Sequence, residues 1–278
     1  MMGVTQSSQV VRSPAKVNWT LRVLGPRPDG FHELESLVSA VSLHDDLCFS
    51  SRPEGAAIAC DDPAVPTGSD NLIARAAAAL ARASGVSRGF SCRVTKRIPL
   101  GGGLGGGSSN AAATLRALNE AWELHWPVER LVPVAASVGS DVPFFLYGGS
   151  AMMRGRGERI EPVHAPFDGW IVLLLPGLHV ATPAVYAECR RMYFSGYGTP
   201  PGVESLDAAG VCEIRDAARR MEQTFNMLEE PAMRVCPPLR TLLDEAARLA
   251  GRPVRLSGSG SSLFTAFNER PQADDFAR

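Results

Sequence analysis

The apolar positions of this chain change their spacing several times, and each spacing predicts a type of element. Alternating apolar and β-branched residues predict strands, and apolar residues three and four positions apart predict helices. The predicted strands are residues 17–24, 34–43, 47–51, 90–97, 151–154, 170–175, 254–256 and 262–267. The predicted helices are residues 72–84, 108–123, 183–192, 207–221 and 239–250, with a further helix starting near residue 127.

Local signals predict where some helices begin and end. Ser69 or Asp70 is expected to cap the alanine-rich helix that follows, and Gly85 is expected to end it. Pro127 suits the first turn of the helix predicted to start near residue 127, whereas Pro133 should bend or shorten that helix. These signals are local, so they predict boundaries and not packing.

The order of the elements mixes strands and helices without an internal repeat, which is typical of an α+β protein. At about 150 residues per domain, the length of 278 residues suits one large domain or two smaller ones, and the pattern changes after residue 150. We therefore expect one domain over residues 1–155 and a second over residues 156–278. Residues 194–205, with three glycines and two prolines, are expected to form a surface loop in the second domain.

Composition and charge restrict the classes of partner. The chain is 45% hydrophobic and 21% charged, which provides ample material for a core. Its 28 basic and 29 acidic residues give a net charge of -1, which argues against nucleic acid as the main partner. No apolar run approaches the roughly 18 residues of a membrane span, and the first residues lack the apolar core of a signal peptide. We therefore expect no membrane association and a cytoplasmic location.

The cysteines and lysines carry two further signals. None of the six cysteines belongs to a C-x-x-C pair, so we expect free, mostly buried thiols and no metal site built by the protein. Of the 28 basic residues only Lys16 and Lys96 are lysines. Because lysine carries a compact point charge and arginine a planar fork, the two are not interchangeable at a tight phosphate site.

The glycine run between a predicted strand and a predicted helix is the strongest chemical signal. Six of the seven residues from 101 to 107 are glycine, which is costly in backbone entropy. Backbone amides at the positive end of a helix form an anion site, and Ser108 and Ser109 add hydroxyl donors. A nucleotide triphosphate is the natural anion of this size. A flexible linker would not require a strand before it and a helix after it.

Two familiar glycine motifs do not fit. The run does not end in Gly-Lys-Ser/Thr, so it is not a Walker-type loop. Gly101, Gly103 and Gly106 satisfy G-x-G-x-x-G, but dinucleotide binding also requires an acidic residue after the following strand. Here Glu120 and Glu123 lie on the helix that starts at the run itself. The run therefore favours a polyphosphate over a dinucleotide.

Three other motifs can contribute to such a site: Pro14-Ala-Lys-Val-Asn18, Gly139-Ser-Asp-Val-Pro-Phe-Phe145 and Ser257-Gly-Ser-Gly-Ser-Ser262. Asp141 is expected at a helix-to-strand junction, where it could cap a turn or face a cleft. Together with residues 99–113, these motifs resemble the GHMP kinases over residues 14–267. The segment Pro28-Asp-Gly-Phe-His-Glu33 narrows the resemblance to kinases that act on a methylerythritol carrying a cytidine diphosphate group.

The resemblance implies a two-domain α+β fold with the active site in the cleft between the halves. It implies ATP-dependent phosphorylation of the C2 hydroxyl of that substrate, in the non-mevalonate route to isoprenoid precursors. By position, Lys16 and Asp141 match the catalytic pair. The residues matching the ATP site are Asn71, near the adenine, and Pro99, Leu100, Gly101, Gly102, Gly103, Leu104, Gly105, Gly106, Gly107, Ser108 and Ser109. The residues matching the substrate site are Asn18, Phe31, His32, Thr182 and Tyr186.

The resemblance also implies Mg²⁺ bound with ATP, for which Ser109 and the phosphates are the candidate ligands. This chain departs from the family at Met227, where an Asp is frequent, and at Phe31, where a Tyr is usual. A polar role at residue 227 is therefore lost, whereas stacking on cytosine needs only the ring. A kinase for another small alcohol, such as mevalonate or homoserine, and an inactive nucleotide-binding regulator remain alternatives. The oligomeric state, monomer or homodimer, stays open.

Overall fold

The computed structural model describes residues 9–86, 88–163, 167–195 and 210–278. The chain forms two compact units, each made of separate stretches. The first unit contains the chain up to Ala15 together with Ser42–Leu100 and Gly105–Gly148. The second contains Lys16–Val41, Gly101–Leu104 and Gly149–Arg278. The glycine run is therefore shared between the units, and the domain division at residue 155 stays a prediction.

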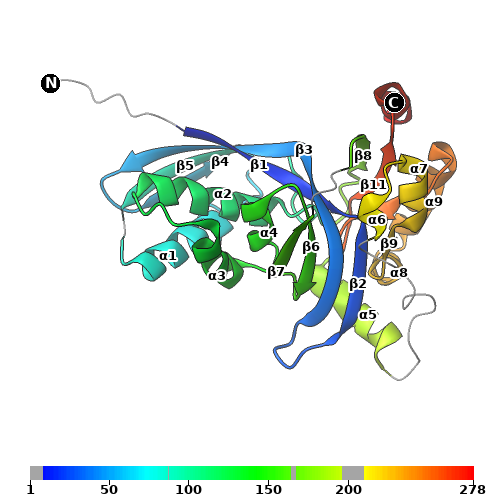
Figure 1. The fold of residues 1–278 in the computed structure, drawn as a ribbon, viewed down its shortest axis with the longest axis horizontal. Coiled ribbons are helices and arrows are strands. Elements are labelled where there is room, and N and C mark those ends of the chain that lie inside the picture. The colour runs from blue at the N-terminus through cyan, green and yellow to red at the C-terminus, as the bar shows by residue number, and fades with distance from the viewer. Residues whose placement is uncertain (1–8, 87, 164–166, 196–209) are drawn as a thin grey trace. The chain divides into compact units, whose positions relative to one another are not determined.

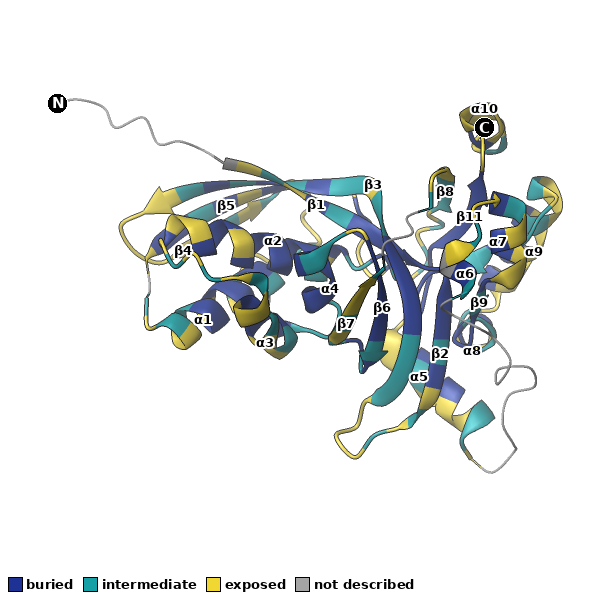
Figure 2. Ribbon diagram, in the orientation of Figure 1, coloured by how far each residue is buried: buried dark blue, intermediate teal, exposed yellow. Residues whose placement is uncertain are grey.

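The first unit packs helices beside a group of strands (Figure 1). Strand β5 (Gly89–Thr95) pairs antiparallel with the C-terminal part of β3 (His32–Arg52) and parallel with β4 (Ala56–Cys60). The helices are α1 (Leu72–Ser84), α2 (Gly106–Ala121), α3 (Val128–Val138) and α4 (Val142–Tyr147). Helix α2 contacts the other three helices and is buried along most of its length (Figure 2). It is therefore the central helix of this unit.

The boundaries of α1 and α3 test the predicted helix signals. Helix α1 ends at Gly85 (φ 72°), as predicted. Its N-cap is Asn71 and not Ser69 or Asp70, because the Asn71 side chain accepts a hydrogen bond from Ile73 N. Pro133 does not end α3, since the helix runs on to Val138, and the expected bend stays a prediction. A proline removes only one backbone donor, and the apolar face of α3 is buried on both sides of it.

Strand β3 is one long strand, although residues 34–43 and 47–51 were predicted as two. The polar residues between them do not break it. Asp45 is fully buried within the strand, and its carboxylate accepts backbone hydrogen bonds from the chain after β5. Conversely, the predicted strand 17–24 is interrupted at Trp19, which separates β1 (Gln9–Asn18) from β2 (Thr20–Pro26). The buried Trp19 donates its backbone N–H to Leu37 O.

The second unit contains two groups of strands. In the first group, the N-terminal part of β3 pairs antiparallel with β2 and with β6 (Ser150–Gly155). Strand β7 (Arg159–Val163) extends this group by pairing with β6. Strand β9 (Phe225–Asn226) pairs parallel with β2. The antiparallel strands β10 (Arg255–Leu256), β11 (Leu263–Phe267) and β8 (Trp170–Leu174) form the other group. The helices are α5 (Thr182–Tyr193), α6 (Gly210–Glu213), α7 (Ala217–Gln223), α8 (Glu229–Val235), α9 (Pro238–Ala250) and α10 (Arg270–Phe276).

Several predictions for this unit need correction. The helix predicted over residues 207–221 is two helices over its described part, because Asp216 caps α7 through a hydrogen bond from Arg219 N. Residues 207–209 and most of the predicted loop 194–205 lie outside the described residues. Strand β7 and helices α8 and α10 were not predicted.

The core of the second unit is an apolar cluster beneath β2, β10 and β11. It includes Leu21, Val185, Leu228, Leu243 and Leu256. Trp19 lies beside it with its ring edge-on to Phe264 at 5.6 Å and under the Arg220 guanidinium at 4.3 Å. These contacts anchor the chain at the point where β1 gives way to β2.

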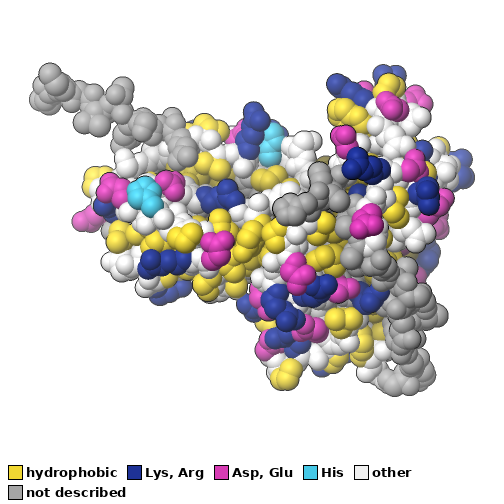
Figure 3. Space-filling model, viewed as in Figure 1, with side chains coloured by type: hydrophobic (Ala, Val, Ile, Leu, Met, Phe, Trp, Pro, Cys, Tyr) yellow, Lys and Arg dark blue, Asp and Glu magenta, His cyan; other side chains and the backbone are white. Residues whose placement is uncertain are grey.

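Charges of both signs are mixed on the surface of the β2–β3 hairpin and the adjoining strands β6 and β7 (Figure 3). Glu33 pairs with Arg27 and Arg159, and Arg154 pairs with Glu35 and Glu161. Among the described residues, no helix has the length and apolar character needed to cross a bilayer.

The structure describes the side chains of five cysteines, and all five are free thiols. Cys92 and Cys189 are buried, and burial raises the pKa of each thiol to about 12. Both are therefore unreactive at neutral pH. Cys48, Cys60 and Cys236 are only half-buried, so the expectation of mostly buried thiols holds for two of the five. A thiol on the half-exposed face of a strand or at a helix end keeps contact with solvent.

Candidate functional site

In the second unit, the first half of the glycine run lies against the Ser-Gly segment 257–262. Ser257 Oγ donates to Gly103 O at 3.1 Å, and Ser262 N donates to Gly102 O at 3.1 Å. Gly103 has φ 75°, and a Cβ at this position would lie 2.0 Å from Ser257 O. Two motifs far apart in sequence therefore form one surface, and this surface requires glycine at residue 103.

Lys16 lies beside this surface. Its backbone N–H donates to Leu104 O at 3.0 Å, and its ammonium lies 3.3 Å from where a Cβ at Gly258 would be. Lys16 Nζ donates to Asn18 Oδ1 at 2.6 Å, and Asn18 Nδ2 donates to Ser36 Oγ at 2.8 Å. Lys16 and Asn18 are each only 5% exposed. The ammonium is thus held at a defined place next to the Ser-Gly segment.

Asn226 lies in β9, next to β2, and its side chain is hydrogen-bonded to the Ser-Gly segment. Its Nδ2 donates to Leu256 O at 2.9 Å and Gly258 O at 2.8 Å, and its Oδ1 accepts from Leu228 N. The sequence prediction did not select Asn226, although it directly precedes Met227, where this chain departs from the family. Met227 itself is buried in the apolar cluster, and its sulfur accepts a hydrogen bond from Val23 N.

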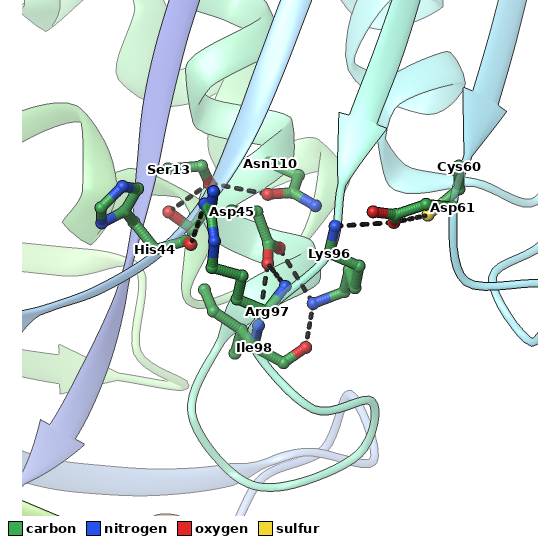
Figure 4. Close-up of polar contacts among 10 residues, drawn as sticks. Ser13, His44, Asp45, Cys60, Asp61, Lys96, Arg97, Ile98 and Asn110 are labelled. Carbon is green, nitrogen blue, oxygen red and sulfur yellow. Dashed lines mark hydrogen bonds and ion pairs between the residues drawn. The ribbon is translucent and has the colours of Figure 1, made fainter.

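In the first unit, the second half of the glycine run opens helix α2. The helix starts at Gly106 after Gly105 (φ 71°), with no side-chain cap and no acidic residue in its first turn. Ser13 Oγ lies 2.7 Å from Ser109 Oγ and 2.7 Å from Asn110 Oδ1 (Figure 4). The first backbone amides of the helix therefore remain for an anion, while its first turn is fixed from the side.

Asp141 also belongs to the first unit, and its predicted setting needs correction. It lies between two helices, α3 and α4, and not at a helix-to-strand junction, because residues 142–147 form a helical turn. Asp141 occupies the N-cap position of α4, yet its side chain makes no capping hydrogen bond there. Its half-buried carboxylate is therefore not explained as a turn cap.

Asn71 has a structural task in this unit. Its Oδ1 caps α1 through Ile73 N, and its Nδ2 donates to Pro66 O at 2.6 Å. Both ends of the amide are thus engaged, which orders the loop before α1. Its place near an adenine stays a prediction. Leu100, at the other edge of the predicted ATP site, is 47% exposed.

The residues predicted to bind the substrate base form two neighbouring groups in the second unit. The His32 and Tyr186 rings lie 4.9 Å apart with their planes 32° from parallel. His32 Nε2 is buried without a hydrogen-bond partner, and burial, together with the nearby Arg190, lowers the pKa of the ring. The Phe31 ring is 47% exposed and lies 4.9 Å from the Arg156 guanidinium, a contact that the sequence prediction missed.

Two further features concern the contacts of Thr182 and the residues that could bind a metal ion. Thr182 Oγ1 lies 2.7 Å from Ser259 Oγ, so the start of α5 is tied to the Ser-Gly segment. Within the described residues, no group of three or more His, Cys, Asp or Glu side chains could hold a metal ion. A metal here would need ligands from a bound molecule.

Comparison with known families and proteins shows to which family the chain belongs. The model of the GHMP kinases N terminal domain matches residues 71–149, and that of the GHMP kinases C terminal domain matches residues 208–278. The first match covers the whole glycine run and helix α2, and the second covers the Ser-Gly segment.

Two curated relatives are similar over most of their length and carry the same name, 4-diphosphocytidyl-2-C-methyl-D-erythritol kinase. That of Prochlorococcus marinus is 39% identical, over 92% of this chain and 83% of its own. That of Bacillus velezensis is 37% identical, over 91% of this chain and 86% of its own. A crystal structure of 4-(cytidine 5'-diphospho)-2C-methyl-D-erythritol kinase is 36% identical, with a TM-score of 0.77 over 97% of this chain and 94% of that one.

Proposed function

This chain belongs to the GHMP kinase family, and on that premise we propose that it phosphorylates 4-diphosphocytidyl-2-C-methyl-D-erythritol. The γ-phosphoryl group of ATP is transferred to the C2 hydroxyl, which gives the 2-phosphate and ADP. One observation carries this substrate: relatives with this name match more than nine-tenths of the chain at 37–39% identity. The reaction belongs to the non-mevalonate route to isoprenoid precursors and takes place in the cytoplasm.

The glycine run is the binding site for the phosphates of ATP. Its first half is fixed by the Ser-Gly segment, and its second half presents the open amides of α2. Backbone amides at a helix N-terminus stabilise negative charge without a counter-ion of their own. The hydroxyls of Ser108 and Ser109 add donors at the same place.

Lys16 and Asp141 carry the chemistry. Phosphoryl transfer requires mainly positioning and charge stabilisation from the protein. The Lys16 ammonium offsets negative charge on the transferred group, and its orientation is set by Asn18. Asp141 accepts the proton of the C2 hydroxyl as the oxygen–phosphorus bond forms and the bond to ADP breaks.

Mg²⁺ accompanies ATP in this proposal, and the described residues fit a phosphate-bound ion better than a protein-bound one. They contain no group of three or more Asp, Glu, His or Cys side chains that could hold a metal ion. Mg²⁺ commonly keeps several waters and binds through phosphate oxygens and one or two protein ligands. Ser109 is the candidate ligand in α2. When bound, the ion neutralises phosphate charge.

The cytidine group is recognised by Phe31, His32 and Tyr186, with Thr182 and Asn18 along the rest of the substrate. The unpartnered Nε2 of His32 supports a hydrogen bond to the edge of the base, because a buried polar atom without a partner is costly. The exposed Phe31 ring offers a face for stacking. A base–aromatic stack contributes about 1–3 kcal/mol, so the hydroxyl of the usual Tyr is not needed for it.

An assay of ADP release with three alcohols tests this function. We expect turnover with 4-diphosphocytidyl-2-C-methyl-D-erythritol and at most trace turnover with mevalonate or homoserine. Phe31→Ala should raise KM for the cytidine substrate by about 5–150-fold, the equivalent of one lost stack, and leave KM for ATP nearly unchanged. Faster turnover with mevalonate or homoserine would assign the chain to another GHMP kinase, and ATP binding without any turnover would indicate a regulator.

A further inference from the structure

We propose that Asp45 and Lys96 are a positioning pair that sets the ATP-phosphate loop in place. Neither residue was assigned a role in the site, and the inference rests on the proposed function. Figure 4 shows the pair between the end of β5 and the start of α2. The side chain of Asp45 is fully buried, and that of Lys96 is 6% exposed.

The Asp45 carboxylate fixes three consecutive residues that lead into the glycine run. Its Oδ1 accepts hydrogen bonds from Arg97 N at 2.8 Å and Ile98 N at 2.9 Å. Its Oδ2 accepts from Lys96 Nζ at 2.9 Å. Pro99 follows directly, so one side chain from β3 determines the direction in which the chain enters the loop.

The Lys96 ammonium links this entry segment to the helix that presents the amides. Besides Asp45, it donates to Ile98 O. It lies 3.3 Å from where a Cβ at Gly106 would be, and that Cβ would also lie 2.9 Å from Ile98 Cγ2. The ammonium and Ile98 therefore pack directly under the first residue of α2. The backbone N–H of Lys96 is held in turn by Asp61 Oδ1 at 2.8 Å.

Stability alone does not account for this arrangement. Burying two charges costs free energy, and an apolar pair of similar volume is often as stable as a buried ion pair. An apolar side chain at residue 45, however, could not accept the two backbone N–H groups before the loop. An apolar side chain at residue 96 could not join Ile98 O to the start of α2. The pair thus specifies the loop conformation, and we expect its loss to weaken ATP binding.

Four variants separate loop positioning from general stability. Asp45→Asn and Lys96→Met each leave one polar partner buried, so both should lower Tm. The double variant Asp45→Asn with Lys96→Met keeps an acceptor for Arg97 N and Ile98 N but removes both charges and the hydrogen bond from Lys96 to Ile98 O. Any ADP affinity that it still lacks therefore measures the positioning by the Lys96 ammonium. Asp46→Asn is the matched control, because Asp46 is the next residue and its carboxylate pairs with the side chains of Arg97 and His44 at the surface. The measurements are Tm, the Kd of ADP by calorimetry, and KM for both substrates.

We expect the Tm of the double variant to return most of the way to the wild-type value. Its Kd for ADP and its KM for ATP should stay about tenfold above wild type, whereas its KM for the cytidine substrate should lie within twofold of wild type. Asp46→Asn should leave all four values near wild type. The proposal fails if the double variant regains ADP affinity together with Tm, or if Asp46→Asn weakens ADP binding equally. If the single variants do not fold, the double variant decides alone. If it does not fold either, the pair is required for folding and the proposal fails. Wild-type protein that binds no ADP would instead overturn the proposed function, and this inference with it.

Discussion

Gly103 and Ser257 lie in direct backbone contact although 154 residues separate them. Ser257 Oγ donates to Gly103 O, and the Ser257 carbonyl fills the space that any side chain at residue 103 would need. This contact joins the first half of the glycine run to the Ser-Gly segment. The contact explains in physical terms why residue 103 is glycine, because the two backbones approach too closely for a Cβ.

Gly103→Ala should therefore damage both fold and function. The new Cβ would lie 2.0 Å from Ser257 O at a positive φ, so one of the two segments must move. We expect a loss of about 1–3 kcal/mol in the free energy of unfolding, measured by urea denaturation. KM for ATP should rise at least tenfold, since the phosphate loop shifts.

Gly68→Ala is the matched control, because a Cβ at residue 68 meets nothing within 4 Å and its φ is not positive. Its unfolding free energy should change by less than about 0.5 kcal/mol. Equal effects of the two substitutions would contradict the contact between Gly103 and Ser257.

Asp141→Asn tests the proposed general base. The amide keeps the size of the side chain but cannot accept the proton, so kcat should fall by about 10²–10⁴-fold. ADP affinity, measured by calorimetry, should remain near wild type because the proposed role of Asp141 is to accept the proton of the substrate hydroxyl and not to bind the phosphates. Turnover within a few-fold of wild type would remove Asp141 from the chemical step.

His32 should make stability depend on pH. Burial lowers the pKa of its ring below the usual 6.5, so the unfolded chain binds a proton more readily than the folded chain. The stability contributed by neutral His32 is therefore present above about pH 6.5 and is lost as pH falls through the folded-state pKa. Denaturation between pH 5 and 7.5 should show a weaker pH dependence for His32→Gln. An unchanged slope would mean that His32 titrates alike in both states.

Met227→Asp restores the residue that is frequent at this place in the family, and it should destabilise this chain. Met227 is 7% exposed within an apolar cluster, so the carboxylate would be buried there. We expect a loss of more than about 2 kcal/mol in unfolding free energy, whereas Met227→Leu should cost less than about 1.5 kcal/mol. Full stability of the Asp variant would show that the cluster can open to admit a charge.

Elements set by contacts within a few residues were predicted well. Helix α1 has the predicted bounds, and β8, α5 and α9 lie within one residue of theirs at each end. Periodicity, glycine stops and proline starts depend on neighbouring residues, and these are visible in the sequence. Where a distant residue supplied a hydrogen bond, as for Asp45 within β3, the local pattern indicated a break that the fold does not make.

The sequence by itself determined the family, the glycine run and the chemical types of the site residues, because those are properties of short segments. Only the tertiary structure decided that Asn226 holds the Ser-Gly segment, that Gly103 meets Ser257, and that Asp45 and Lys96 brace the entry to the run. Such contacts join residues about 30 to more than 150 positions apart in the chain. Their partners are chosen by how strands and loops pack, and no local periodicity records that choice.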